Sequence, residues 1–337
     1  MPDRKLLILS PIPEEAIRLL VGQRVGPGEL EGVSIVGYTG TSKGELIAAV
    51  ADADVIVGDY TGSVVLDEEA LRAARRCILV QQPSAGFDSI DTAAAAGLGI
   101  PVANVGGANT SAVAEHTLML ILACLKKLTL VHEKTRHGEW LQDGIAGYGV
   151  FNLWGRTLGI IGMGRIGREV ARRARPFGAR LVYCSRHRLD PELERSLDVA
   201  WRPLDDLIAR SDVITVHTPL TPQTANLINA ERIAGMKPDA IIINVSRGAI
   251  VDEAALARAL IEGRLGGAGL DVFAREPLDA ASPLLGAPNV ILTPHIAGAT
   301  AEAQAQIVEV TIDNVVRALR GQEPANVVNG VTARRPR

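Results

Sequence analysis

The sequence predicts an α/β protein with two domains, each built on a parallel β-sheet covered by helices. Short aliphatic runs alternate with helical patterns along the chain, which is typical of parallel strands joined by helices. The first series of predicted strands reads LLIL, VSIV, DVIV, CILV and IPVA, and the second reads TLGIIG, RLVYC, VITVH, AIIINV, GAGLDVF and NVILTP. With 337 residues, the chain exceeds the size at which one hydrophobic core stops growing, so two domains are expected.

The boundary between the two series is predicted near Asn104. The segment GGANT at 106–110 interrupts the alternation, and one helical stretch from Ser111 to about His132 opens the second series. An amphipathic helix from about Ala301 to Leu319 follows TPHIAGAT and can return to the first series. This layout predicts a boundary near Asn104 and allows the C-terminal helix to cap the first domain.

Composition excludes several classes of function. A net charge of −3 with dispersed arginines disfavours a nucleic-acid partner. Cys77, Cys124 and Cys184 form no Cys-x-x-Cys pair, which argues against a disulfide framework and a metal site and fits the cytoplasm. The longest apolar stretch, Thr117 to Leu125, is too short for a membrane span, and the first apolar run is too short for a signal peptide. We therefore expect a buried core helix at the former and a first strand at the latter.

A glycine-rich loop predicts a dinucleotide site. The strand TLGII runs into Gly162, Gly164 and Gly167 of GMGRIG. Their spacing suits a tight turn, close approach of the backbone to a pyrophosphate, and close packing of helix on strand. The following helix would present one apolar face and turn its N-terminus to the phosphates; that face consists of Ile166, Val170, Ala171, Ala174 and Phe177. Glycines of purely structural use are the alternative.

The tip of the next strand bears on the choice of cofactor. In proteins that bind NAD, an acidic residue about 20 residues after the glycines holds the ribose hydroxyls. Here the tip reads Cys184, Ser185, Arg186, His187 and Arg188, and contains no acid. A hydroxyl and two guanidinium groups would suit a 2′-phosphate, so NADP is predicted over NAD. Solvated surface arginines are the alternative.

Three polar residues at the ends of late strands suggest reduction of a 2-oxo acid. Carboxyl ends of parallel strands border a common crevice, so Arg247, Glu276 and His295 can meet there. Arg247 would bind the substrate carboxylate and polarise the carbonyl group. His295 would donate the proton, and Glu276 would orient the imidazole and favour its protonated form. Taken singly, each residue could equally be structural or solvated.

At this point the sequence resembles the D-isomer-specific 2-hydroxyacid dehydrogenases, from about Asp54 to Thr300. The resemblance rests on VAEHTL (113–118), GIIGMGRIG (159–167), HTPLTPQTANLIN (217–229), NVSRGAIVDEAAL (244–256), GAGLDVFAREP (267–277) and TPHIAGAT (293–300). It implies Arg247, Glu276 and His295 as the catalytic residues. It also implies cofactor contacts beyond the glycines and the strand tip, at Arg165, Ile166, His217, Thr218, Pro219, Thr224, Val245, Ser246, Asp271, Ala297 and Gly298.

The resemblance further implies two Rossmann-like domains, with the active site between them. Residues 1–104 and 299–337 would form a flavodoxin-like substrate domain, and residues 105–298 a doubly wound cofactor domain. The loop with Ala85 and Gly86 is similar to one whose N–H groups hold the substrate carboxylate, while Asp88 and Asp91 suit turn and helix caps. Family members are commonly homodimers, which implies a dimer arm at about 110–153. Trp140, Tyr148 and Trp154 would line the substrate pocket or pack the dimer arm. The identity of the acid that is reduced stays open.

Two alternatives accompany this prediction. The same architecture resembles nicotinamide-sensing corepressors that act by binding partners, and phosphite oxidation uses the same framework. Glu276 disfavours the formate dehydrogenase branch, whose corresponding residue resembles a glutamine. A Ser-Arg strand tip resembles that of NADP-dependent reductases of the glyoxylate or hydroxypyruvate type.

Overall fold

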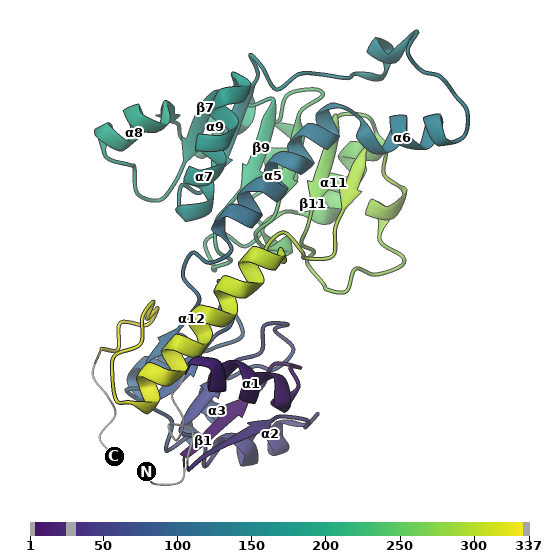
Figure 1. Ribbon diagram of the computed structural model, residues 1–337. Helices are drawn as coiled ribbons and strands as arrows, with labels where there is room; N and C mark the ends of the chain where they lie inside the picture. Colours follow the sequence, from purple (N-terminus) through teal and green to yellow (C-terminus); the bar gives the residue numbers. More distant parts are fainter. Residues whose placement is uncertain (1–3, 25–31, 333–337) are drawn as a thin grey trace. The chain divides into compact units, whose positions relative to one another are not determined.

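The computed structural model describes residues 4–24 and 32–332 and divides into two compact units. Unit 1 comprises Met1–Asn109 with Ala301–Arg337, and unit 2 comprises Thr110–Thr300 (Figure 1). The first boundary lies five residues beyond the predicted Asn104/Val105. The reason is local: Asn104 N–H donates to the Asn326 carbonyl at 3.2 Å, and Gly106 packs against the Asn326 side chain.

Unit 1 contains a five-stranded parallel sheet in the order β2-β1-β3-β4-β5, the flavodoxin-like order expected from the sequence. All five predicted strands of this unit are present. They are β1 (Arg4–Ile8), β2 (Val33–Gly37), β3 (Val55–Val57), β4 (Leu79–Gln81) and β5 (Val102–Ala103).

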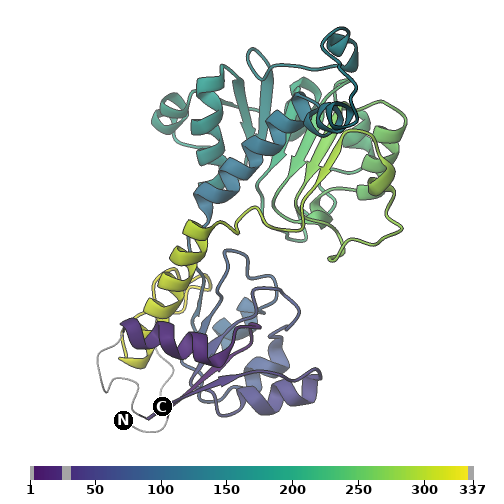
Figure 2. The same cartoon turned by 45° about the vertical axis from the view of Figure 1, so that its right-hand side comes forward.

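Helices cover both faces of this sheet, because successive strand residues point to opposite faces. Leu7 and Ile56 face the side covered by α2 (Lys43–Val50), α3 (Glu68–Ala73) and α4 (Thr92–Gly97). Leu6 and Ile8 face α1 (Glu14–Arg24) and α12 (Ala301–Leu319), which lie side by side (Figures 1 and 2). Helix α12 has the predicted bounds. Asp91 caps α4 by accepting the Ala94 N–H, as predicted.

Unit 2 contains a seven-stranded parallel sheet in the order β12-β11-β10-β9-β6-β7-β8. The strands are β6 (Thr157–Ile161), β7 (Arg180–Cys184), β8 (Val199–Trp201), β9 (Val213–Val216), β10 (Ile241–Asn244), β11 (Gly267–Leu270) and β12 (Val290–Leu292). The order reverses between β6 and β9, and in such sheets ligands bind at the carboxyl ends beside this switch point. The sequence predicts six of these strands and misses β8, whose three residues give no usable alternation.

The helices of unit 2 also form two layers. One core joins the sheet to α5 (Thr110–Leu125) and α7 (Arg165–Ala174); the other joins it to α9 (Leu204–Arg210) and α11 (Glu253–Ile261) (Figure 1). Shorter elements are α6 (Leu128–Arg136), η1 (Ile145–Tyr148), η2 (Arg175–Phe177), α8 (Pro191–Leu197), α10 (Ala230–Ala234), η3 (Gly248–Ile250) and η4 (Pro283–Gly286). The buried residues of α5 confirm the predicted core helix.

Two helix predictions need correction. The single helix predicted from Ser111 to His132 is broken at Lys127, which has a φ of 52° and whose ammonium group donates to the Gly266 carbonyl at 2.6 Å. Phe177, predicted on the buried face of α7, lies in η2 and is 44% exposed. In the described ranges no helix is long and apolar enough to cross a membrane.

Candidate functional site

The glycine loop has the geometry of a dinucleotide cradle. Gly162 has a φ of 97°, and a Cβ atom there would lie 2.5 Å from the His217 carbonyl oxygen. At Gly167 a Cβ would lie 2.1 Å from the Gly162 carbonyl oxygen, so helix α7 can approach the loop only with glycine. Gly164 faces open space and gives the first turn of α7 no side-chain cap. The backbone N–H groups of that turn, including those of Arg165 and Ile166, are therefore available to bind an anion.

Two buried polar atoms next to the loop fit a bound cofactor. His217 Nδ1 and Thr218 Oγ1, at the end of β9, have no hydrogen-bond partner within the described residues. The other ring nitrogen, His217 Nε2, lies 2.9 Å from Thr215 Oγ1. Burial lowers the pKa of His217 to about 3, so its imidazole is neutral at physiological pH. Buried polar groups normally have partners, which makes these atoms suited to a ligand.

The two arginines of the strand tip have different binding partners. Arg188 Nε and Nη2 bind the Glu194 carboxylate at 2.8 and 2.9 Å, and Tyr183 Oη donates to the same carboxylate at 2.6 Å. Arg188 and then Tyr183 hold the pKa of Glu194 down at about 2. Arg186 Nε contacts only the neighbouring His187 ring, at 3.2 Å, among its recorded bonds. Both arginines are exposed, but within the described residues only Arg188 is paired with a carboxylate, so its charge is neutralised locally.

Cys184 and Ser185 complete the tip without adding charge. Burial raises the pKa of the Cys184 thiol, and repulsion from Asp205 raises it further, so the thiol stays neutral. The Ser185 hydroxyl donates to the His187 carbonyl at 2.5 Å. The position that carries an acid in NAD-binding proteins is therefore neutral here.

Arg247 follows β10 and is positioned by Asn244, the last residue of that strand. Asn244 is buried; its Oδ1 accepts the Ser246 N–H at 3.1 Å, and its Nδ2 donates to the Arg247 carbonyl at 2.9 Å. Gly248 then lies against the Phe273 carbonyl group, where a Cβ atom would be 1.8 Å from the carbon. Asn244 has no predicted role from the sequence, although an amide at the end of an otherwise aliphatic strand is a usable signal.

His295 and Glu276 form a hydrogen-bonded pair in the structure. His295 Nδ1 lies 2.7 Å from Glu276 Oε2, and Glu276 Oε1 accepts the Phe273 N–H at 3.0 Å. The side chains are 49% and 37% exposed, so both can reach a ligand. With Nδ1 directed to the carboxylate, Nε2 is the ring nitrogen that can exchange a proton with a substrate.

Asp271 holds the backbone that carries His295. Its buried carboxylate accepts the Thr293 hydroxyl at 2.6 Å and the N–H groups of Ile296 and Ala297 at 2.9 and 2.8 Å. Its carbonyl accepts the His295 N–H at 2.8 Å. These bonds fix His295 at a φ of 55°, a conformation that a residue with a side chain adopts only where its surroundings impose it.

His116 of α5 extends this network and was not identified from the sequence. His116 Nε2 lies 3.1 Å from Thr293 Oγ1. Because the Thr293 hydroxyl donates to Asp271, Nε2 carries the hydrogen in this contact. Burial lowers the pKa of His116, and attraction to Asp271 opposes this effect.

Other predicted cofactor residues have local contacts. The Thr224 hydroxyl donates to the Pro219 carbonyl at 2.7 Å and closes the turn after β9. The Ser246 hydroxyl lies 3.2 Å from Asn244 Oδ1. Val245 and Ala297 are buried beside Asn244 and Asp271, and Gly298 follows in the same loop; the backbone of these three residues is what they can offer a ligand.

The predicted carboxylate loop of unit 1 turns its carbonyl groups inward. Asn104 Nδ2 donates to the Ala85 carbonyl at 2.8 Å, and the Ser84 hydroxyl donates to the Gly86 carbonyl at 2.7 Å. No hydrogen bond from the N–H of Ala85 or Gly86 is found within residues 4–24 and 32–332. This arrangement suits anion binding by the two N–H groups.

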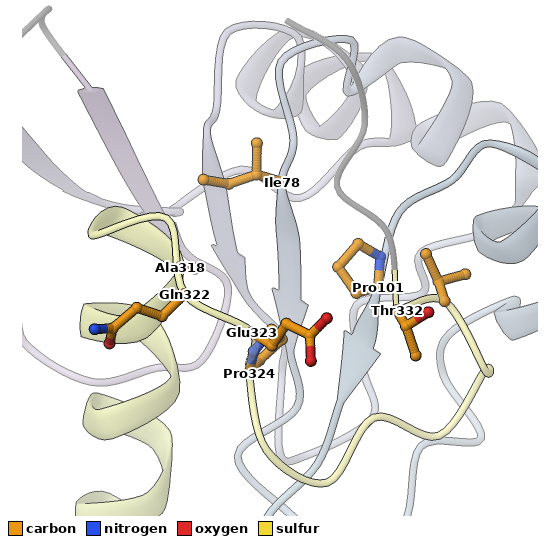
Figure 3. A pocket seen from close by; sticks show the side chains of 8 residues that line it. Ile78, Pro101, Ala318, Gln322, Glu323, Pro324 and Thr332 are labelled. Atoms are coloured by element: carbon orange, nitrogen blue, oxygen red, sulfur yellow. The ribbon is translucent and has the colours of Figure 1, made fainter.

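A separate pocket of unit 1 contains none of these residues (Figure 3). Its cavity volume of about 20 Å³ is room for one water molecule, so it cannot hold an organic substrate. It is lined by Ile78, Pro101, Ala318, Gln322, Glu323, Pro324, Val331 and Thr332.

The family model described as D-isomer specific 2-hydroxyacid dehydrogenase, NAD binding domain, matches residues 118–297. A glyoxylate reductase from Thermococcus onnurineus is 37% identical over 332 residues, covering 96% of this chain and 96% of that protein. One from Aeropyrum pernix is 41% identical over 289 residues, covering 84% and 85%. The crystal structure of a glyoxylate reductase from Paecilomyes thermophila superposes with a TM-score of 0.84 at 29% identity, covering 100% of this chain and 99% of that chain.

Proposed function

Because the chain belongs to the D-isomer-specific 2-hydroxyacid dehydrogenase family of hydride-transfer oxidoreductases, we propose that it reduces a small 2-oxo acid of the glyoxylate and hydroxypyruvate class at C2. The observation that carries this proposal is the His295–Glu276 hydrogen bond of 2.7 Å on the same unit as the glycine loop. The relatives named as glyoxylate reductases support the substrate class.

The nicotinamide cofactor supplies the hydride when bound. Gly162, Gly164 and Gly167 leave room for its pyrophosphate, and the first turn of α7 offers N–H groups to the phosphates. His217 Nδ1 and Thr218 Oγ1 would gain in this site the partners that they lack within the described chain. The remaining predicted contacts, including Asp271 facing the nicotinamide amide, stay predictions from the family resemblance.

Three residues would carry the chemistry at the substrate. Arg247 would bind the carboxylate through its planar guanidinium group and polarise the carbonyl. His295 Nε2 would give its proton to the carbonyl oxygen during reduction and recover it during oxidation. Glu276 would hold the ring through Nδ1 and stabilise the imidazolium form. Binding of the carboxylate by Ala85 and Gly86 is part of the same proposal.

We also propose that NADPH is preferred over NADH. The strand tip supports this choice, since Cys184 is neutral and Arg186 is exposed. A phosphate dianion gains from a guanidinium group and is repelled by the acid that NAD-binding proteins carry at this position. Arg188, which pairs with Glu194, contributes less than Arg186.

Turnover measurements test the proposed reaction. The protein is assayed with NADPH and NADH against glyoxylate, hydroxypyruvate, pyruvate and an aromatic 2-oxo acid. We expect oxidation of NADPH with one of the small acids as the best substrate. The Arg247→Lys variant should raise KM and lower kcat together, because lysine cannot reproduce a two-point contact with a carboxylate.

Two results would contradict the proposal. Tight cofactor binding without turnover on any 2-oxo acid would favour a nicotinamide-sensing role. An Arg247→Lys variant with the kcat/KM of the wild type would remove Arg247 from the site. Arg264→Lys is the matched control, because Arg264 lies after α11 and pairs with Glu262 on the surface.

We propose a homodimer formed through residues 110–153. Large apolar side chains are exposed along this arm: Met119 (46%), Leu128 (54%), Trp140 (76%) and Tyr148 (44%). Several large apolar side chains left exposed along one segment are typical of a surface that is covered by a partner. We expect light scattering to give the mass of two chains, and Trp140→Ala with Leu128→Glu to shift it towards one. A wild-type mass of one chain at micromolar concentration would refute the dimer.

A further inference from the structure

Glu253 lies at the start of α11, immediately beside the turn that carries Glu276. Its Oε1 accepts the N–H of Ala274. Glu276 Oε1 accepts the N–H of Phe273, the preceding residue. Two carboxylates therefore bind consecutive N–H groups of one turn, and this brings Glu253 close to the Glu276–His295 pair.

The turn that binds Glu253 is also packed against neighbouring segments. Gly248 packs against the Phe273 carbonyl on one side, since a Cβ atom there would lie 1.8 Å from the carbonyl carbon. Phe273 itself is buried in the core shared with α11. The bond from the Ala274 N–H to Glu253 is therefore one of the contacts that position the turn from which Glu276 extends.

The two carboxylates also interact through their charges. Burial raises the pKa of Glu253, the Ala274 N–H lowers it, and repulsion from Glu276 raises it again. This repulsion is mutual. A charged Glu253 therefore makes it more favourable for the Glu276–His295 pair to hold a proton.

The neighbouring segments contain other charged groups, but none of them duplicates this contact. Asp252 caps α11 by accepting the Ala255 N–H. The Asp271 carboxylate accepts backbone N–H groups of the loop at 293–297. The remaining charged or titratable groups are Arg247 after β10, Arg275 and Asp279 in the turn, and His116 of α5.

We propose that Glu253 is a positioning residue for Glu276 and that its negative charge, next to the Glu276–His295 pair, stabilises the imidazolium form of His295. This inference rests on the proposed roles of Glu276 and His295. A reductase needs the protonated imidazole, whereas the reverse oxidation needs the neutral one.

The test is the Glu253→Gln variant, which keeps an oxygen acceptor for Ala274 and removes the charge. Its kcat/KM is measured from pH 6 to 10 in both directions. We expect the pH midpoint at which reduction is lost, and the midpoint at which oxidation appears, to fall together by about 0.5 to 1 pH unit.

Control variants distinguish this effect from a structural one. Glu262→Gln removes a carboxylate from the other end of the same helix and should leave both profiles unchanged. Glu253→Ala removes charge and acceptor; it should show the same midpoint shift and also a lower kcat in both directions. If the Gln variant does not fold, comparison of Glu253→Ala with Glu262→Ala provides the same test.

Unmoved midpoints in a folded Glu253 variant would overturn the inference, and so would equal losses in both directions without a shift. Failure of the proposed function looks different. In that case His295→Ala retains the wild-type kcat, whatever the Glu253 variants do.

Discussion

Replacement of His295 by alanine should lower kcat about 10²- to 10⁴-fold, the contribution of a positioned acid, while the Kd for the cofactor changes little. His295 carries the ring that would exchange the proton, and its backbone position is fixed independently by Asp271. The glycine loop lies at the ends of other strands, β6 and β7. Steady-state kinetics with NADPH and fluorescence titration of the cofactor measure the two quantities.

The matched control is His137→Ala. His137 follows α6, is 72% exposed and bonds the Glu133 carbonyl of its own helix, so its loss should leave kcat unaltered. A His295→Ala enzyme that works at the wild-type rate would show that another group delivers the proton. A variant that loses cofactor binding as well would place His295 in the structure of the cofactor site.

Replacement of Arg186 by alanine should raise the KM for NADPH about ten- to hundredfold and barely affect NADH. A charge-assisted hydrogen bond contributes on the order of 1.5 to 3 kcal/mol, and about 1.4 kcal/mol corresponds to a factor of ten. Only NADPH carries the 2′-phosphate that such a bond would recognise. The comparison of kcat/KM for the two cofactors, in wild type and variant, measures the effect.

Arg188→Ala is the informative partner of this experiment. Arg188 is bound at both Nε and Nη2 by Glu194, so we expect a smaller rise in the KM for NADPH than with Arg186→Ala. Equal effects of the two substitutions would mean that the Arg188–Glu194 pair opens for the phosphate. A wild-type enzyme that favours NADH, or an Arg186 variant that loses both cofactors equally, would refute the NADPH preference.

The local sequence pattern was sufficient to predict most of the strands and the cofactor loop. Strands such as β6 and β10 are buried on both faces, so they read as short aliphatic runs whatever surrounds them. Gly162 and Gly167 are recognisable because their backbone requirement is local to one strand, one turn and one helix. Strand β8 was missed because three residues carry too little pattern to distinguish a strand from a loop.

Pairing of side chains could not be predicted in the same way. No glycine or proline in the sequence indicates the helix break at Lys127. The break depends on the Gly266 carbonyl, which lies far along the chain. Arg186 and Arg188 look equivalent in sequence, yet only Arg188 reaches Glu194, because helix α8 returns to the strand tip.

By itself, the sequence determined two parallel α/β sheets, a dinucleotide loop and the three residue types that a 2-oxo acid reductase requires at the strand ends. The contacts that hold those residues come from the tertiary structure alone. Asn244 and Asp271 bind the backbone of the segments that carry Arg247 and His295, and Glu253 binds the backbone of the turn that carries Glu276. The physical reason is that burial and backbone conformation leave a periodic trace in neighbouring residues. A hydrogen bond or an ion pair depends instead on which distant segments the completed fold brings within about 3 Å of each other.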